Sequence, residues 1–437
     1  MRPIALLFLL LTSVLMVSAP FCEGEDAYEV VFADSLGARS FDRPHDIAAD
    51  GAGGMWLLVD TDGKMSVAGN QLHHKISRWN LAWMNAEHKW VWAEKLRSEC
   101  ADEYSRFALA ATGDSCWVAG PDKGRKHGDI IYDDIHVGRY DKKHARKANR
   151  KFGATGGDKF GAVCADGDSC VVAGMLAGRC SLGDHRVSKT EPTLFVARLD
   201  SEGKLLTGAH AGFEGSVEVK AVCASYGAVT VAGTFEGSVE FGESKLSTKS
   251  RSFFVARLTK DMKWQWVASP EPPGAASLAG CAVTATGATV LSGTYEGALT
   301  LGKHFVGSTP NSEVFVATLT PAGKWRNAKQ IDGLVLNNAQ DICLDSNGDI
   351  HIAMTVNSSK SARNPNFRRE SRIVKLSANY EEIKRVSLAA DDAEVVALSP
   401  TADGALWVTG EYRGEFKVTD KSIYGRGGTD IFVLLIR

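Results

Sequence analysis

The stretch Phe-Val-Ala-Arg-Leu at residues 195–199 decides the fold, because it returns along the chain at a nearly constant spacing. It recurs unchanged at residues 254–258 and as Phe-Val-Ala-Thr-Leu at residues 315–319. Weaker copies lie at residues 75–79, 136–140, 372–376 and 432–436. The fourth positions of successive copies are 61, 59, 59, 61, 57 and 60 residues apart. A fixed period over most of the 437 residues predicts a repeat architecture instead of several unrelated domains.

The segment at residues 219–270 shows what one repeat contains. Short apolar stretches alternate there with turns that are rich in Gly, Asp and Ser. This pattern predicts four antiparallel strands, at residues 220–224, 228–233, 254–258 and 263–268. No sustained helical period follows residue 24. About seven such units in succession predict an all-β fold, a seven-bladed β-propeller of four-stranded antiparallel blades.

The two ends of the chain indicate how the ring closes. The chain ends at Arg437, directly after the third strand of the last unit. Residues 28–33, Tyr-Glu-Val-Val-Phe-Ala, have the fourth-strand pattern but belong to no unit. We therefore expect an N-terminal strand to complete the last blade and to cover its open edge. The expected organisation is a single β-propeller domain at residues 25–437, with a closing strand at 25–36 and blades at about 43–96, 105–153, 158–210, 218–270, 278–331, 339–388 and 394–437.

The middle units resemble a known repeat family. Residues 233–242 read Gly-Thr-Phe-Glu-Gly-Ser-Val-Glu-Phe-Gly, and residues 263–268 read Lys-Trp-Gln-Trp-Val-Ala. With the strand between them, they resemble the SBBP-type β-propeller repeat. The likeness is strong over about residues 160–330. The first unit, with Arg-Pro-His-Asp-Ile-Ala-Ala-Asp at residues 43–50 and Met-Trp-Leu-Leu-Val-Asp at residues 55–60, resembles an NHL-type propeller repeat as much. The SBBP resemblance implies a secreted or surface propeller, and it brings no catalytic motif.

The N-terminal sequence indicates where the protein is located, and the net charge indicates which partners are disfavoured. Arg2, the apolar run at residues 4–17 and small residues after it match a secretory signal peptide at residues 1–24. A membrane anchor is disfavoured, because a span needs about 20 apolar residues. The net charge of −2 argues against a nucleic-acid binder. The predicted localisation is secreted, extracellular or at the cell surface, which means periplasmic or outer surface in a bacterium.

The cysteines permit disulfides, since eight of the nine remain once a signal peptide containing Cys22 is removed. Cys164 and Cys170 flank a short turn, and Cys100 and Cys116 flank another close segment. Both pairs are expected disulfides, and buried free thiols are the alternative. Asn357 opens the sequon Asn-Ser-Ser and is a candidate glycosylation site in a eukaryote.

The chain carries no nucleophile elbow, Walker loop, zinc-binding helix motif or Cys-x-x-Cys pair. Asp345, Asn347 and Asp349 have the spacing that opens a calcium loop, but Val356 stands where the bidentate Glu would be required. We therefore predict no catalytic residue, no cofactor and no metal site. The inner-strand residues His45 and Asp46, together with Asp341, are the few candidates that would serve an enzyme.

Positively charged residues are most concentrated at residues 142–151. Clusters of this kind attract polyanions such as sulfated glycans, and a solvated blade edge is the alternative. The six cations are Lys142, Lys143, Arg146, Lys147, Arg150 and Lys151. The predicted function is a non-enzymatic binding or scaffold module for a protein or a polyanionic glycan in the extracellular space. The module is expected to be monomeric, without nucleic acid and without a transmembrane span. The alternative is a propeller hydrolase or lyase with its site at the channel mouth.

Overall fold

The computed structural model describes residues 28–38, 41–61, 64–73, 79–96, 107–127, 130–154, 156–182, 185–187, 192–271, 274–331, 337–357, 369–388, 390–418 and 421–437. These residues form strands, turns and loops, and none of them lies in a helix, so the all-β prediction is confirmed. No helix able to cross a membrane occurs within this part of the chain. The expected signal peptide, Cys100 and the side chain of Asn357 lie outside what is described.

The strands form four-stranded antiparallel groups, as the repeat predicts. Three groups stand as follows in spatial order: β2 (Asp42–Ala49), β3 (Met55–Thr61), β6 (Trp79–Met84) and β7 (Trp90–Lys95); β8 (Ala108–Thr112), β9 (Ser115–His127), β10 (Ile130–Asp141) and β11 (Arg146–Phe152); β21 (Ala276–Val283), β22 (Thr289–Leu301), β23 (His304–Leu319) and β24 (Trp325–Ile331). Two small hairpins accompany them, β4 (Lys64–Val67) with β5 (Asn70–His73), and β14 (Cys180–Leu182) with β15 (His185–Val187).

Two further groups share one long strand, β17. Its first part, residues 205–212, pairs with β16, and its second part, residues 212–225, pairs with β18. The strand is therefore the outermost of one group and the innermost of the next. The order is β12 (Lys159–Asp166), β13 (Ser169–Ala177), β16 (Pro192–Leu199), β17 (Leu205–Ser225), β18 (Ala228–Phe241), β19 (Ser244–Leu258) and β20 (Trp264–Ala268).

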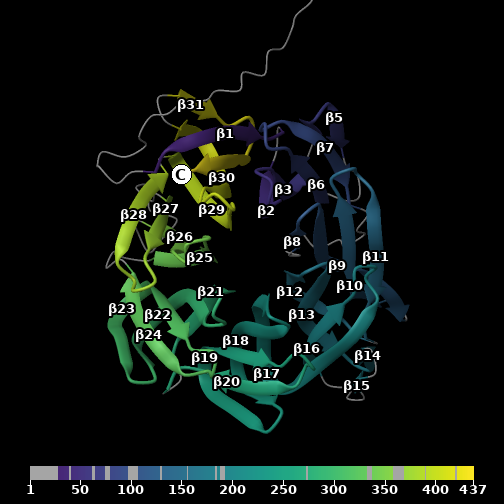
Figure 1. The fold of residues 1–437 in the computed structure, drawn as a ribbon, viewed down its shortest axis with the longest axis vertical. Coiled ribbons are helices and arrows are strands. Elements are labelled where there is room, and N and C mark those ends of the chain that lie inside the picture. Colours follow the sequence, from purple (N-terminus) through teal and green to yellow (C-terminus); the bar gives the residue numbers. More distant parts are fainter. Residues whose placement is uncertain are drawn as a thin grey trace, which may run out of the picture.

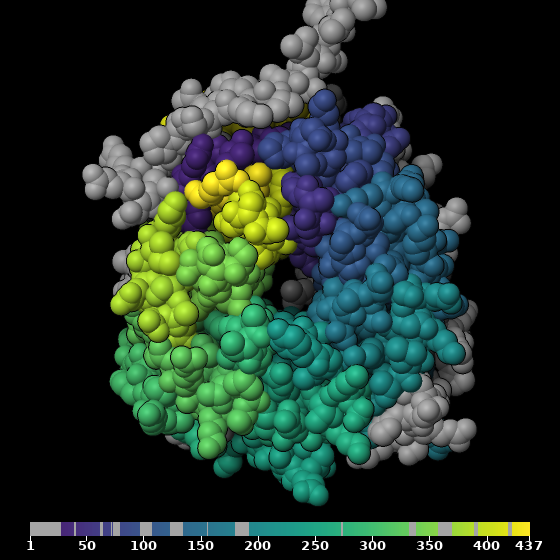
Figure 2. Space-filling view, viewed as in Figure 1, coloured from purple at the N-terminus to yellow at the C-terminus, as the bar shows by residue number. Residues whose placement is uncertain are grey.

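The remaining strands include both ends of the described chain. β1 pairs antiparallel with β32 from Val30 opposite Ile436 to Leu36 opposite Ile431. The order of these two groups is β25 (Asn337–Leu344), β26 (Ile350–Asn357), β27 (Arg369–Leu376) and β28 (Glu382–Leu388), then β29 (Ala390–Pro400), β30 (Leu406–Val418), β32 (Asp430–Ile436) and β1 (Val30–Leu36), with β31 (Lys421–Tyr424) beside β30. Figure 1 shows the groups following one another around a common centre in chain order. Figure 2 shows a narrow opening at that centre.

The repeated Phe-Val-Ala-Arg-Leu stretch packs each group against its neighbours. Phe195 and Val196 are both fully buried, but in two different hydrophobic clusters, because successive side chains of a strand point to opposite faces. Phe315 of β23, the first residue of its copy, stacks on Phe253 of β19, which directly precedes the copy at residues 254–258, with ring centroids 5.5 Å apart. Burial of such aromatic side chains from both faces makes each group depend on the next for its stability.

The arginine of this stretch ties neighbouring groups together. Arg198 donates to the carbonyl oxygen of Gly227 at 2.6 Å, and Arg257 donates to that of Gly287 at 2.8 Å. Both glycines lie in the turn between the first two strands of the following group. They need the left-handed conformation there, with φ of 79° and 81°. The fourth position of the repeat is therefore a link between groups.

The expected disulfide between Cys164 and Cys170 is not formed in the structure. In the pairing of β12 with β13, Cys164 lies opposite Val171, and Cys170 lies opposite Ala165. The pairing is thus offset by one residue, and the two sulfurs lie on opposite faces of the sheet. Cys116, the described member of the other expected pair, is a buried free thiol.

Candidate functional site

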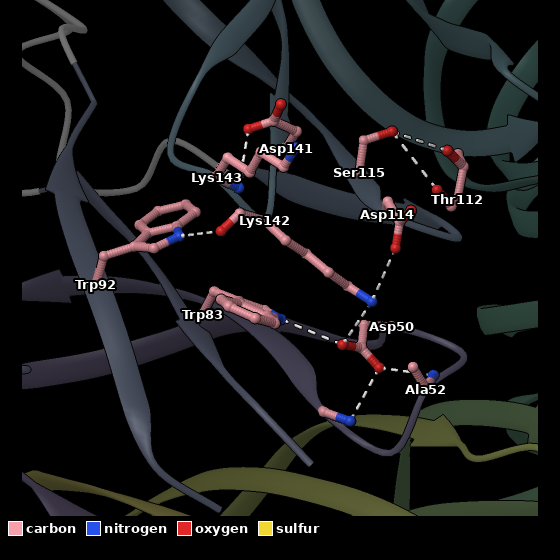
Figure 3. Close-up of polar contacts among 11 residues, drawn as sticks. Asp50, Ala52, Trp83, Trp92, Thr112, Asp114, Ser115, Asp141, Lys142 and Lys143 are labelled. Carbon is pink, nitrogen blue, oxygen red and sulfur yellow. Dashed lines mark hydrogen bonds and ion pairs between the residues drawn. The ribbon is translucent and has the colours of Figure 1, made fainter. Parts of the chain in front are cut away.

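The basic segment at residues 142–151 forms the turn after β10 and the outer strand β11. The side chain of Lys142 reaches between Asp50 and Asp114 (Figure 3), and it is 17% exposed. Its Nζ lies 3.0 Å from Oδ2 of Asp50 and 3.3 Å from Oδ1 of Asp114. It also sits 5.9 Å from the centre of the Trp83 ring. Because Asp50 precedes the turn between β2 and β3, this ion pair joins the first two strand groups.

Both carboxylate oxygens of Asp50 accept hydrogen bonds. Asp50 accepts them from the backbone N–H groups of Ala52 and Gly54, at 2.8 and 2.9 Å, and from Nε1 of Trp83 at 3.2 Å. Its side chain is 2% exposed. A buried carboxylate with several donors and one cation is a structural element, so Lys142 is held in the fold instead of facing a ligand.

Two further lysines of the segment also have carboxylate partners. Lys147 lies 2.9 Å from Oδ2 of Asp141. Lys151 lies 3.4 Å from Oδ2 of Asp122 and 3.9 Å from Oδ2 of Asp134. These contacts offset much of the positive charge that the sequence alone displays.

The other three cations of the segment are exposed: Lys143, Arg146 and Arg150. No carboxylate of the described residues forms an ion pair with any of them. The pairing of β10 with β11 shifts register between Arg139 and Tyr140, so Arg146, opposite Tyr140, and Arg150, opposite Val137, leave opposite faces of this outer strand. The structure thus divides the predicted site into one structural lysine, Lys142, two exposed lysines with carboxylate partners, and three exposed cations without one in the described part of the chain.

The inner-strand candidates for an enzyme have structural roles. Oδ2 of Asp46 accepts a hydrogen bond from the N–H of Leu109 at 2.7 Å, and Oδ2 of Asp341 accepts one from Leu398 at 2.8 Å. Each carboxylate thereby connects the inner strand of one group to that of the next. The ring of His45 packs on Trp79, with centroids 4.2 Å apart.

A cluster of six charged side chains lies where three groups meet. We refer to it as the six-charge cluster; its members are Arg43 on β2, Arg369 on β27, Asp392 and Glu394 on β29, and Glu411 and Arg413 on β30. Arg369 forms an ion pair with Glu394, and its Nε lies 3.4 Å from Oδ1 of Asp392. Arg43 Nε lies 3.7 Å from Oε2 of Glu411.

Glu411 is the perturbed acid of this cluster. Burial raises the pKa of its carboxyl group, and the neighbouring Glu394 raises it further, while the arginines act in the opposite direction. Glu394 itself accepts a hydrogen bond from Nε2 of Gln340 at 2.9 Å. A carboxyl group with a raised pKa can donate a proton, and the arginines beside it can bind an anionic ligand. The sequence alone does not reveal this cluster, because its members come from four strands of three groups.

An outward-facing cleft of about 620 Å³ lies along β17, β18 and β20. His210, Glu243 and Trp264 are among its lining residues. The indole Nε1 of Trp264 donates to the carbonyl oxygen of His210 at 3.0 Å, which fixes the ring across the boundary between two groups. In the sequence, Trp264 was visible only as part of the repeated pattern at residues 263–268, and His210 and Glu243 did not stand out.

The turn with calcium-loop spacing is held by its own hydrogen bonds. Oδ1 of Asp345 accepts from the N–H groups of Asn347 and Asp349, at 2.9 and 3.0 Å. Oδ2 of Asp345 accepts from Nζ of Lys375 at 2.8 Å. In the part of the chain that is described, no three His, Cys, Asp or Glu residues are placed to hold a metal ion.

Comparison with known proteins supports the fold alone. No family model matches the chain, so the SBBP and NHL resemblances rest on the residues quoted above. No curated protein matches it in sequence. An ulvan lyase, a polysaccharide lyase described bound to -[GlcA(1-4)Rha3S]-, has a TM-score of 0.50 at 9% identity, with 91% of this chain and 97% of that chain covered.

Two other similar structures have lower scores. A neuraminidase-like protein of A/little yellow-shouldered bat/Guatemala has a TM-score of 0.40 at 7% identity, with 76% of this chain and 94% of that chain covered. The N-terminal domain of Nup159 has a TM-score of 0.40 at 10% identity, with 96% and 98% covered. These neighbours are propeller-like folds, and the likeness concerns the fold alone.

Proposed function

We propose that this chain is a secreted or cell-surface binding module, a seven-bladed β-propeller closed by β1, which holds a polyanionic glycan on the outer strand β11. The observation that carries the proposal is the set of exposed cations Lys143, Arg146 and Arg150, which have no carboxylate partner among the described residues. Cations that a fold does not neutralise are free to pair with an external anion.

The geometry of β11 suits an extended ligand. Arg146 and Arg150 stand opposite Tyr140 and Val137 of β10, three positions apart, which places them about 10 Å from each other along the strand, on its two faces. Guanidinium groups bind sulfate and carboxylate oxygens through two parallel hydrogen bonds. A chain with regularly spaced sulfate or carboxylate groups, such as a sulfated glycan, would contact the two arginines and Lys143 by crossing the open outer edge of β11.

The proposal is tested by retention of the full-length protein on a heparin column. The natural protein is expected to elute above about 0.15 M salt, the physiological ionic strength. The triple variant Lys143→Gln, Arg146→Gln, Arg150→Gln should elute near the void. A matched control replaces three exposed lysines elsewhere, Lys249, Lys303 and Lys324, with Gln. Elution of the natural protein at or below that salt concentration, or equal losses in both triple variants, would overturn the proposal.

The six-charge cluster supports a second candidate function, a hydrolase or lyase acting on an anionic saccharide. In this reading Glu411, in its protonated form, donates a proton to the leaving oxygen, and the half-exposed Arg43 and Arg413 bind the anionic group of the substrate. Assay of reducing ends released from uronic-acid polysaccharides tests it. Turnover that falls at least a hundredfold in Glu411→Gln would favour the enzyme, and absence of turnover would favour the binding module.

A further inference from the structure

Three cysteines lie on the inner strands of consecutive groups. Cys164 is on β12, Cys223 on β17 and Cys281 on β21. The Sγ atoms of Cys223 and Cys281 are 3.5 Å apart, although 58 positions separate the two residues. The Cys223 thiol also donates to the carbonyl oxygen of Cys281 at 3.0 Å. Two thiols from neighbouring groups are therefore in direct contact on the inner strands.

The contact is close to what a disulfide requires. An S–S bond is about 2.05 Å long, so the two sulfurs would have to approach by about 1.5 Å. Rotation about the Cα–Cβ bonds moves sulfur atoms by this amount without a change of backbone. Cys116 and Cys170 are placed differently from the pair of Cys223 and Cys281, since each is fully buried in a separate hydrophobic cluster.

We propose that Cys223 and Cys281 form a dithiol that closes into a disulfide between two neighbouring blades. The oxidant is a disulfide, either oxidised glutathione or the active-site disulfide of a thiol oxidase. The Cys223 thiolate attacks one sulfur of that disulfide, forms a mixed disulfide and releases the other sulfur as a thiol. The Cys281 thiolate then attacks the Cys223 sulfur and displaces the second thiol. Two protons and two electrons thereby pass from the protein to the oxidant.

The order of attack follows from exposure. Cys223 is partly exposed, whereas Cys281 is buried. The hydrogen bond with Cys223, followed by burial, raises the pKa of the Cys281 thiol well above its usual range. Because the thiolate is the reactive form, Cys281 suits the second step, in which its target is already in contact.

Cys164 is the competing partner. It occupies the same repeat position as Cys223, one group earlier, and it interacts electrostatically with Cys223. No direct contact between these two sulfurs matches the 3.5 Å approach of Cys223 to Cys281 among the described residues. The geometry therefore assigns the disulfide to Cys223 and Cys281.

Peptide mapping of the folded full-length protein tests the assignment. The protein is incubated with oxidised glutathione, alkylated and cleaved with trypsin without reduction. Cys223 falls in the peptide 221–245, Cys281 in 264–303, and Cys164 in 160–179. The expected product links the first two peptides in the natural protein and in Cys164→Ser, and is missing in Cys281→Ser.

The melting temperature of the natural protein gives a second test, which does not depend on the folding of a variant. The oxidised natural protein should melt roughly 5 °C or more above its reduced form, because the cross-link restricts the unfolded chain. Addition of a reducing agent should reverse the shift. A product that links Cys223 to the Cys164 peptide, or no linked product after oxidation of the folded natural protein, would overturn the proposal.

Discussion

The hydroxyl oxygen of Tyr28 lies 3.1 Å from Nδ1 of His351, although 323 positions separate the two residues. Nε2 of the same ring lies 3.2 Å from Oδ2 of Asp345, which also accepts from Nζ of Lys375. The carboxylate accepts the Nε2 proton, so Nδ1 is the acceptor and Tyr28 the donor. This chain of hydrogen bonds fastens the N-terminal segment to the group that contains β26.

Replacement of Tyr28 with Phe should lower the free energy of unfolding by about 1–2 kcal/mol, because Nδ1 of the buried His351 loses its donor. Thermal or urea unfolding measures the effect. Tyr226→Phe is the matched control, since the Tyr226 side chain is 85% exposed. Equal stability of the Tyr28 variant and the natural protein would show that the hydrogen bond does not hold this segment.

Deletion of residues 25–36 should lower the melting temperature by roughly ten degrees or more. The deletion removes β1 and leaves the edge of β32 without its partner. It also removes the buried Phe32, which contacts Trp407, and Asp34, which accepts a hydrogen bond from Nε1 of Trp90 on β7. Differential scanning calorimetry gives the shift, and a change of about one degree would contradict a closing role for β1.

The protein should lose stability when the pH falls below about 6.5. Burial lowers the pKa of His351, His136 and His88 below the ordinary value of 6.5. The unfolded chain therefore binds protons at a higher pH than the folded chain, and acid favours unfolding across that window. Urea unfolding at pH 7.5, 6 and 5 measures the trend, and His351→Gln should make it shallower. A pH-independent midpoint would contradict the burial of these rings.

Asp345 should cause a further loss of folding stability at lower pH. Burial acts to raise the pKa of this carboxyl group, but hydrogen bonds from Lys375 and His351 outweigh it and hold the pKa below 3.8. Its contribution to stability is present above that value and is lost as the pH falls through the lower folded value.

Replacement of Lys142 with Gln should destabilise the protein by about 2 kcal/mol, because it leaves the buried Asp50 without its cation. Lys143→Gln, the neighbouring exposed lysine, is the control and should change stability by less than about 0.5 kcal/mol. In the double variant with Asp50→Asn, the two losses should not add. Equal effects of the two lysine substitutions would show that Lys142 is an ordinary surface residue.

The strands were predictable because their causes are local. The alternation at residues 195–199 and its copies indicated buried strands, and Phe195, Phe254 and Phe315 are fully buried. The break between units was harder to place. Residues 205–225 were divided between two units, yet they form the single strand β17, since the change of partner needs no turn.

The site was less predictable because its geometry comes from distant residues. The charge run at 142–151 was visible in the sequence, but the pairing of Lys142 with Asp50 and Asp114 depends on turns of two groups. The six-charge cluster likewise combines Arg43 with residues 369–413. The offset between Cys164 and Cys170 is set by the register of one hairpin, which spacing alone does not reveal.

The most direct test of the proposed function is a calorimetric titration of the full-length protein with a heparin oligosaccharide at about 0.05 and 0.15 M salt. We expect saturable binding that weakens as the salt rises, and a loss of about tenfold or more in affinity when Lys143, Arg146 and Arg150 are changed to Gln. Absence of saturable binding at the lower salt concentration, or an unchanged affinity in the triple variant, would contradict the assignment of β11 as the ligand-binding strand.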